Sequence, residues 1–288
     1  MLNVIRMELY RLYKNKSCYI ILFMIAIMAL VNVFYISKGL NSSDGRGRLV
    51  IEPRQTWDLL DLPNLPLGIN YDSRLLVNGT NTVTAFDEAS VLLSSSLVLL
   101  STGVFAIIFV IGGTTSGFMK NIASCIKKRR YIILSDIVAL SVFILMEFAV
   151  LLLVTELASL IFIKQLFHGI SIEQLRYMGL QFLLYIAYSE LVLFVVTALK
   201  NAPISIILHI FFCWNFGTLL NYFIFHYCAL FINSSVPLNL LNYYLIPNIV
   251  LLSGNAPYGI GIRAFGVSIA AILLYGMFGI AVIEKRDI

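Results

Sequence analysis

Acidic side chains inside long apolar stretches are the residues of this sequence best placed to do chemistry. Four such acids occur, Asp136, Glu147, Glu156 and Glu190. Each costs about 2.5–3.5 kcal/mol to place in hydrocarbon, so each is expected to face protein or water. A carboxyl group held in this way can attract a cation, exchange a proton or form a hydrogen bond between helices.

Glu147 and Glu190 are the candidates for a translocation route. They fall near the middle of two neighbouring antiparallel stretches, within about two helical turns of the same depth. We predict that they line the route and attract cationic cargo; the alternative is that they are protonated and form hydrogen bonds across helices. Asp136 lies at the border of its stretch, where Arg129 and Arg130 are the predicted ion-pair partners.

Catalytic motifs are missing from the sequence. It has no Ser/His/Asp arrangement, no HExxH, no carboxylates paired on a helix face and no phosphate loop of the form GxxxxGK[ST]. The remaining candidate ligands are scattered and have no CxxC spacing: His168, His209, His226, Cys18, Cys125, Cys213 and Cys228. We therefore expect no catalytic residue, no metal site, no disulfide framework and no cofactor in this chain.

Composition places the chain in a membrane. Of its 288 residues 60% are hydrophobic and 12% are charged, whereas soluble domains average about half and a quarter. Six apolar runs each have about 20 residues, the length that a helix needs to cross about 30 Å of hydrocarbon. We predict one all-α integral membrane domain over residues 1–288, with six transmembrane helices. The net charge of +5 lies beside these runs, which indicates contact with lipid and not with nucleic acid.

A basic segment between two apolar runs sets the predicted orientation. Residues 112–136 hold five basic side chains, Lys120, Lys127, Lys128, Arg129 and Arg130. Because Lys and Arg beside membrane spans are retained on the cytoplasmic side, residues 114–131 are expected to form a cytosolic loop. We predict a multi-pass protein of the cell membrane with both termini in the cytoplasm.

Residues 1–16 are predicted to form an amphipathic helix in the cytosolic interface. Leu2, Leu9 and Tyr13 fall in one apolar arc, and Glu8 and Arg11 fall opposite. A signal peptide is the rival interpretation. The apolar run that follows is too long for a signal peptide and has no small-x-small cleavage site.

The other elements are assigned outward from the basic loop. The predicted spans are residues 18–36, 91–113, 132–163, 180–199, 204–224 and 264–283. Residues 38–88 form an outer loop, either a small irregular cap or a plain connector, and residues 164–177 form a shorter one. Residues 225–263 are apolar but interrupted by Pro and Gly, so we predict re-entrant segments that dip into the outer leaflet before the last helix.

The sequence resembles a known family in three places. These are the first helix with Glu8 and Arg11, the loop SGFMKNIASCIKKRRYIILSD and the terminal EKRDI. Together with six spans they are similar to ABC-2 type permeases, the six-helix membrane subunits of bacterial ABC exporters of the Gram-positive type. The residues that match the loop of that family are Gly117, Lys120, Asn121, Ile122, Arg130 and Tyr131. Asp136 stands where the family usually has a Lys.

The resemblance implies a permease that moves peptide-like, drug or lipid cargo outward, in bacteriocin export or in immunity. A separate ABC ATPase would bind ATP and Mg, and a second permease copy or a sister permease would complete the pore. The loop would form a coupling helix that docks on the ATPase. Its predicted docking residues are Gly117, Lys120, Asn121, Ile122, Ile126 and Arg130. The alternative is an ATP-independent channel or secondary transporter, although the sequence shows no internal repeat of the kind common in carriers.

The orientation is testable by labelling with a membrane-impermeant thiol reagent on intact cells. A cysteine introduced at Ser73 is expected to react because residues 38–88 are outside, and Cys125 is expected not to react because residues 114–131 are inside. The opposite labelling pattern would overturn the orientation argued from Lys and Arg.

Overall fold

A computed structural model describes residues 2–42, 85–118, 129–163, 171–232, 240–252 and 256–285. Within these ranges every regular element is a helix. The helices are α1 (Leu2–Lys14), α2 (Lys16–Ser42), α3 (Ala85–Ser94), α4 (Ser96–Thr115), α6 (Arg130–Phe162), α7 (Ile172–Leu199), α8 (Ala202–Cys213), α9 (Phe216–Ile232), the 3-10 helix η3 (Leu240–Tyr243), α10 (Leu245–Leu251) and α11 (Tyr258–Glu284).

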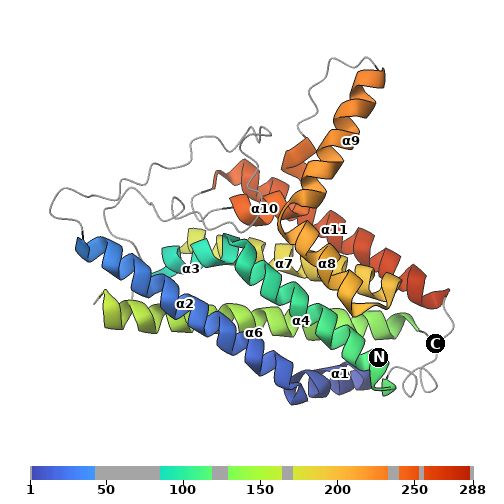
Figure 1. Cartoon of the computed structure of the whole chain (residues 1–288), viewed down its shortest axis with the longest axis horizontal. Coiled ribbons are helices and arrows are strands. Elements are labelled where there is room, and N and C mark those ends of the chain that lie inside the picture. The colour runs from blue at the N-terminus through green and yellow to red at the C-terminus, as the bar shows by residue number, and fades with distance from the viewer. Residues whose placement is uncertain are drawn as a thin grey trace.

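The long helices form a bundle around α6 and α7 (Figure 1). α2 packs on α6, α11 packs on α7, and α4 and α8 pack on the remaining side of α7. α1 lies against α6 at one end of the bundle, and the end of α11 lies at that same end (Figure 1). The first helix and the end of the last helix therefore lie at one end of the bundle, and the cytoplasmic placement of the two termini stays a prediction.

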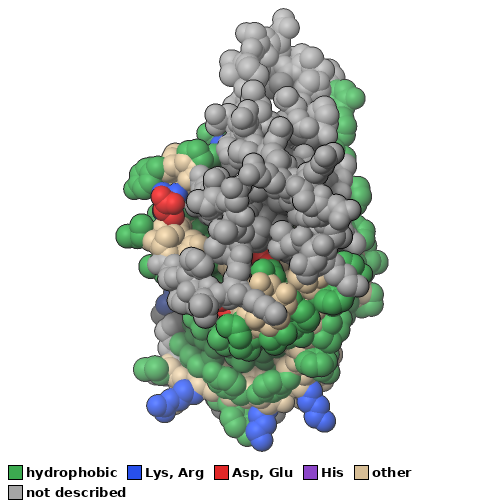
Figure 2. Space-filling view, turned by 90° about the vertical axis from the view of Figure 1, so that its left-hand side faces the viewer, with side chains coloured by type: hydrophobic (Ala, Val, Ile, Leu, Met, Phe, Trp, Pro, Cys, Tyr) green, Lys and Arg blue, Asp and Glu red, His purple; other side chains and the backbone are tan. Residues whose placement is uncertain are grey.

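Five helices in the described part of the chain are long and apolar enough to cross a membrane: the spans Lys16–Tyr35, Ser96–Thr115, Arg130–Phe162, Ile172–Leu199 and Tyr258–Glu284. The prediction of an all-α, multi-pass membrane protein is therefore confirmed. On the face shown in Figure 2, hydrophobic side chains cover most of the described surface, and Lys and Arg side chains project from its lower edge. Along the bundle, large apolar side chains such as Phe23 of α2, Leu153 of α6 and Met277 of α11 are exposed, as expected of helices that contact lipid.

The predicted fifth span, residues 204–224, is not one continuous helix. α8 ends at Cys213, and α9 begins at Phe216. Between them Asn215 has a φ of 62°, a left-handed conformation that Asn tolerates better than most residues. The carbonyl oxygen of Asn215 accepts the first bond of α9, from the amide of Leu219 at 3.0 Å. The chain turns at this point, and α9 extends away from the bundle (Figure 1).

The predicted second span, residues 91–113, is also interrupted. Ser95 has an extended backbone with a ψ of 144°, which separates α3 from α4. The hydroxyl groups of Ser94 and Ser95 donate to the carbonyl oxygens of Val91 and Leu92 at 3.0 and 2.6 Å. Serine side chains that bond to the backbone in this way compete with the helical pattern. A run of three serines is therefore the local cause of the break.

Several predicted boundaries are wrong by a few residues. α7 begins at Ile172, inside the outer loop predicted for residues 164–177, because Ser171 and Gln174 form a capping box. α11 begins at Tyr258 and not at residue 264. The first residues of the predicted outer loop 38–88 belong to α2 and the last ones belong to α3. Residues 43–84 lie outside the described residues. The region 225–263 contains the end of α9, η3, α10 and the first turns of α11.

A buried histidine joins α8 to α4 and α7. The Tyr188 hydroxyl lies 2.6 Å from Nδ1 of His209, and Nε2 of His209 lies 3.0 Å from the carbonyl oxygen of Leu100. Because a carbonyl only accepts, Nε2 carries the proton and Nδ1 accepts from Tyr188. The ring lies directly over Gly103, where a Cβ atom would collide with it. The position of α8 thus depends on the absence of a side chain at residue 103.

Gly103→Ala is expected to destabilise the protein by about 1–3 kcal/mol, because the new methyl group displaces the His209 ring. The matched control is Gly112→Ala in the same helix, where nothing lies within 4 Å of the new Cβ. The control should leave stability unchanged or raise it slightly, since Ala favours helix. The midpoint of thermal unfolding in detergent measures both. Equal midpoints for the two variants would contradict the packing of His209 on Gly103.

Candidate functional site

The first helix turns a partly charged face toward the protein. Val4, Glu8 and Leu12, at successive positions four residues apart, are buried, whereas Leu2 and Tyr13 are exposed. Glu8, which falls opposite the predicted apolar arc, is nevertheless buried, on the side of α1 that contacts α6. α1 is thus held by polar as well as apolar groups.

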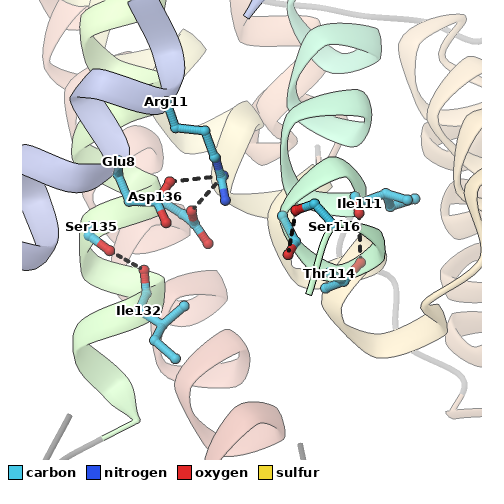
Figure 3. Close-up of polar contacts among 9 residues, drawn as sticks. Glu8, Arg11, Ile111, Thr114, Ser116, Ile132, Ser135 and Asp136 are labelled. Atoms are coloured by element: carbon cyan, nitrogen blue, oxygen red, sulfur yellow. Dashed lines mark hydrogen bonds and ion pairs between the residues drawn. The ribbon is translucent and has the colours of Figure 1, made fainter. Parts of the chain in front are cut away.

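Arg11 of α1 joins two carboxyl groups (Figure 3). Its Nη2 atom lies 2.9 Å from Oε2 of Glu8 and 3.4 Å from Oδ1 of Asp136, which is on α6. Both carboxyl side chains have an exposed fraction of 0%, and that of Arg11 is 17%. We call Glu8, Arg11 and Asp136 the basal cluster.

The basal cluster also reaches α4. The guanidinium carbon of Arg11 lies 3.9 Å from the centre of the Phe109 ring and 5.1 Å from that of Phe118. Gly113 leaves room for it, since a Cβ there would collide with Nη1 of Arg11. A cation over aromatic faces in a site shielded from water is stabilised by about 2 kcal/mol. One side chain of α1 therefore contacts the end of α4 and the start of α6.

The charge in the cluster does not balance if both carboxyl groups ionise. Burial and, to a lesser degree, the nearby Asp136 carboxyl raise the pKa of Glu8 from 4.5 to about 8, against the opposing effect of the Arg11 guanidinium. Glu8 therefore holds its proton at neutral pH, and the neutral acid leaves a one-to-one pair of Arg11 and Asp136. The sequence predicts Arg129 and Arg130 as the partners of Asp136; the ion pair that the structure shows is with Arg11.

The two described residues of the predicted coupling set flank this cluster. Gly117, with a φ of 72°, follows α4 and is next to Phe118, and Arg130 is the first residue of α6. The guanidinium carbon of Arg130 lies 5.8 Å from the centre of the Tyr131 ring, and the side chain is exposed. The other four, Lys120, Asn121, Ile122 and Ile126, lie outside the described residues. The predicted coupling segment therefore begins beside the basal cluster at Gly117 and ends six residues before Asp136 on α6.

Glu147 and Glu190 face different helices. Glu147 accepts hydrogen bonds from Ser101 at 3.0 Å and from Thr102 at 2.7 Å, both on α4. Glu190 faces α11, where a Cβ on Gly276 would lie 3.0 Å from its Oε2 atom. Both acids are buried, and no hydrogen bond joins them among the described residues. Glu147 thus makes the hydrogen bonds between helices that the alternative interpretation predicts. That Glu147 and Glu190 line a translocation route stays a prediction.

A further buried acid was not singled out in the sequence. Glu88, assigned to the outer loop, lies in α3 and accepts a hydrogen bond from Ser159 of α6 at 3.0 Å. Its only sequence signal is its place three residues before the apolar run that begins at Val91. As for metals, no group of three His, Cys, Asp or Glu side chains in the described ranges is arranged to hold an ion. Of the cysteines in those ranges, Cys18 and Cys213 are buried and free, and Cys228 is exposed and free.

Comparison with known protein families finds no matching family, and comparison with curated proteins finds no relative.

The protonation of Glu8 predicts a pH dependence. Between pH 4.5 and 8 the folded state keeps a proton that the unfolded chain releases, so the stability from this residue is fully present below pH 4.5 and declines as the pH rises to 8. Glu8→Gln cannot ionise and should flatten this decline. Thermal unfolding midpoints across that range measure it.

The control is Glu173→Gln, which neutralises an exposed acid at the start of α7. It should keep the decline of the original protein. A decline that survives unchanged in Glu8→Gln would show that Glu8 is not the buried, protonated group.

Proposed function

We propose that this chain is an ABC-2 type permease, the transmembrane subunit of an ATP-driven exporter. A separate ATPase supplies ATP hydrolysis, and a second copy or a sister permease completes the transport unit. The cargo is peptide-like, a drug or a lipid, and a peptide is favoured by the resemblance. Both bacteriocin export and immunity, in which peptides are cleared from the membrane, fit this activity.

The observation that carries the proposal is the basal cluster. An ATPase that displaces the loop of residues 119–128 also displaces the end of α4 and the start of α6, because the loop connects these two helices. Arg11 contacts both of these helices, through Phe109 and Asp136. Motion of the loop is therefore passed to α1 and α2 through a contiguous set of contacts, as coupling requires.

The topology of the proposed permease has six crossings. α8 and α9 together make the fifth crossing, which is interrupted at Asn215, and η3 and α10 are the re-entrant segments of the outer leaflet. Both termini and the loop of residues 114–131 lie in the cytoplasm. The route passes Glu147 and Glu190. Both acids are buried within the single chain, so they line the route only once a partner permease is present.

An ATP-independent carrier or channel is the second candidate, and the helix breaks favour it. Carriers often bind substrate at discontinuous helices, and this chain has breaks at Ser95 and at Asn215. Solute flux by the purified chain alone in vesicles, driven by an ion gradient and unaffected by ATP, would support this function over the permease.

Docking of an ATPase on the predicted coupling segment can be tested by co-purification. Ile122→Asp combined with Ile126→Asp should abolish co-purification of a subunit that has an ATP-binding phosphate loop, because two charges replace the apolar face of the coupling helix. Membrane insertion should be unaffected, and ATPase activity in the eluate should fall to background.

The matched control is Ala123→Asp combined with Ser124→Asp, which adds the same charge to the other side of the segment. It should retain the ATPase. A complex that forms equally well with both double variants would rule out docking through Ile122 and Ile126.

A further inference from the structure

A groove runs along the outer half of α11. It has a volume of about 720 Å³ and lies between α11 and the segment of η3 and α10. Its walls include Tyr244, Arg263, Gly266, Ala270, Leu274 and Tyr275. We call it the α11 groove. Every residue that lines it belongs to the described part of the chain.

The α11 groove contains two hydrogen-bond donors without an acceptor. The Nε atom of Arg263 and the hydroxyl of Tyr244 are buried and have no hydrogen-bond partner among the described residues. Arg263 is the one charged residue in the walls, and no acid accompanies it. A buried donor without a partner is costly, and a guanidinium is best satisfied by a carboxylate or a phosphate. The groove is therefore complementary to an anionic ligand.

The remainder of the groove is apolar and shallow. Beyond Arg263 the walls along α11 are Gly266, Val267, Ala270, Ala271 and Leu274. At Gly266 nothing lies within 4 Å of the place where a Cβ would stand, and Leu274 is exposed. This part of α11 presents small and aliphatic side chains to the surroundings, which in a membrane protein are acyl chains.

The dimensions of the groove fit one membrane leaflet. Arg263 lies five residues from the start of α11, about 8 Å along the helix axis from Tyr258. Tyr275 lies twelve residues further, about 18 Å along the axis, which is slightly more than half of a hydrocarbon core of about 30 Å. An anionic group at Arg263 is thus at the depth of a lipid headgroup, and an acyl chain that follows the groove ends near the middle of the bilayer.

We propose that the α11 groove binds one phospholipid of net negative charge from the surrounding bilayer. Its phosphate accepts from Arg263 and from the hydroxyl of Tyr244, and one acyl chain lies over Gly266 and Ala270 toward Leu274. A negatively charged headgroup is preferred because a zwitterionic headgroup brings a cation close to Arg263. This site is independent of the ATPase and of the translocation route.

The experiment is a lipid titration of the purified full chain in detergent, followed by native mass spectrometry. The probes are phosphatidylglycerol and phosphatidylcholine with identical acyl chains. The original protein should retain one phosphatidylglycerol in preference to phosphatidylcholine. Arg263→Gln should weaken phosphatidylglycerol binding about tenfold or more, the loss of one charge-assisted bond.

Two further variants distinguish the contribution of the lipid headgroup to binding from that of the acyl chain. Tyr244→Phe removes only the hydroxyl and should weaken phosphatidylglycerol binding severalfold. Ala270→Trp fills the groove without changing its charge and should weaken both lipids. Arg6→Gln, which neutralises an exposed Arg on α1, is the control for loose attraction to anionic lipid and should retain the bound molecule.

Several outcomes would overturn the proposal. Equal retention of the two lipids, or phosphatidylglycerol binding that Arg263→Gln leaves unchanged, means that Arg263 does not hold a headgroup. A dimer of the original protein that retains no lipid, and that Ala270→Trp converts to a monomer, means that the groove is covered by a second copy of the chain.

Discussion

In hydrocarbon a backbone carbonyl released at a helix break must find a donor inside the protein, and this requirement explains the central place of α7. α7 carries a column of polar side chains on the face that it turns to α3, α4 and α10. Tyr177 donates to the carbonyl oxygen of Ser90 at 3.0 Å, and Tyr185 donates to that of Leu93 at 2.6 Å. Gln181 donates to the carbonyl oxygen of Ile249 at 2.9 Å. The interrupted parts of the chain are therefore packed where α7 can satisfy them.

The same requirement applies to the break between α3 and α4. The serine hydroxyls satisfy the carbonyls of Val91 and Leu92, Tyr185 satisfies that of Leu93, and the thiol of Cys213 lies 3.1 Å from the carbonyl oxygen of Ser96. The donors come from three different helices. A break that needs such partners is stable only in the assembled bundle, so α7 and α8 are required for the bend at Ser95.

Polar contacts have a different role at the end where α1 lies. There the groups are charged, and Arg11 compensates one carboxylate while the raised pKa of Glu8 keeps the second acid neutral. Removing the cation alone would leave buried negative charge, which costs about 3–5 kcal/mol. In the proposed permease this arrangement makes α1, α4 and α6 move together below the broken helices.

Much of this architecture follows from the sequence by itself. Continuous apolar runs determine α2, α6 and the inner part of α11, because a helix is the only form in which such a run satisfies its own backbone in lipid. The amphipathic helix at the start of the chain was also predictable, as was the burial of Glu147 and Glu190. The breaks at Ser95 and Asn215 were not, because hydropathy is the same on both sides of each. The carbonyl oxygen of Leu93, released at the first break, finds its donor in Tyr185, 92 positions away, and the second break is a left-handed backbone conformation that hydropathy does not indicate. The pairing of Arg11 with Asp136 likewise joins residues 125 positions apart, so only the packing of α1 on α6 decided which basic side chain met that acid.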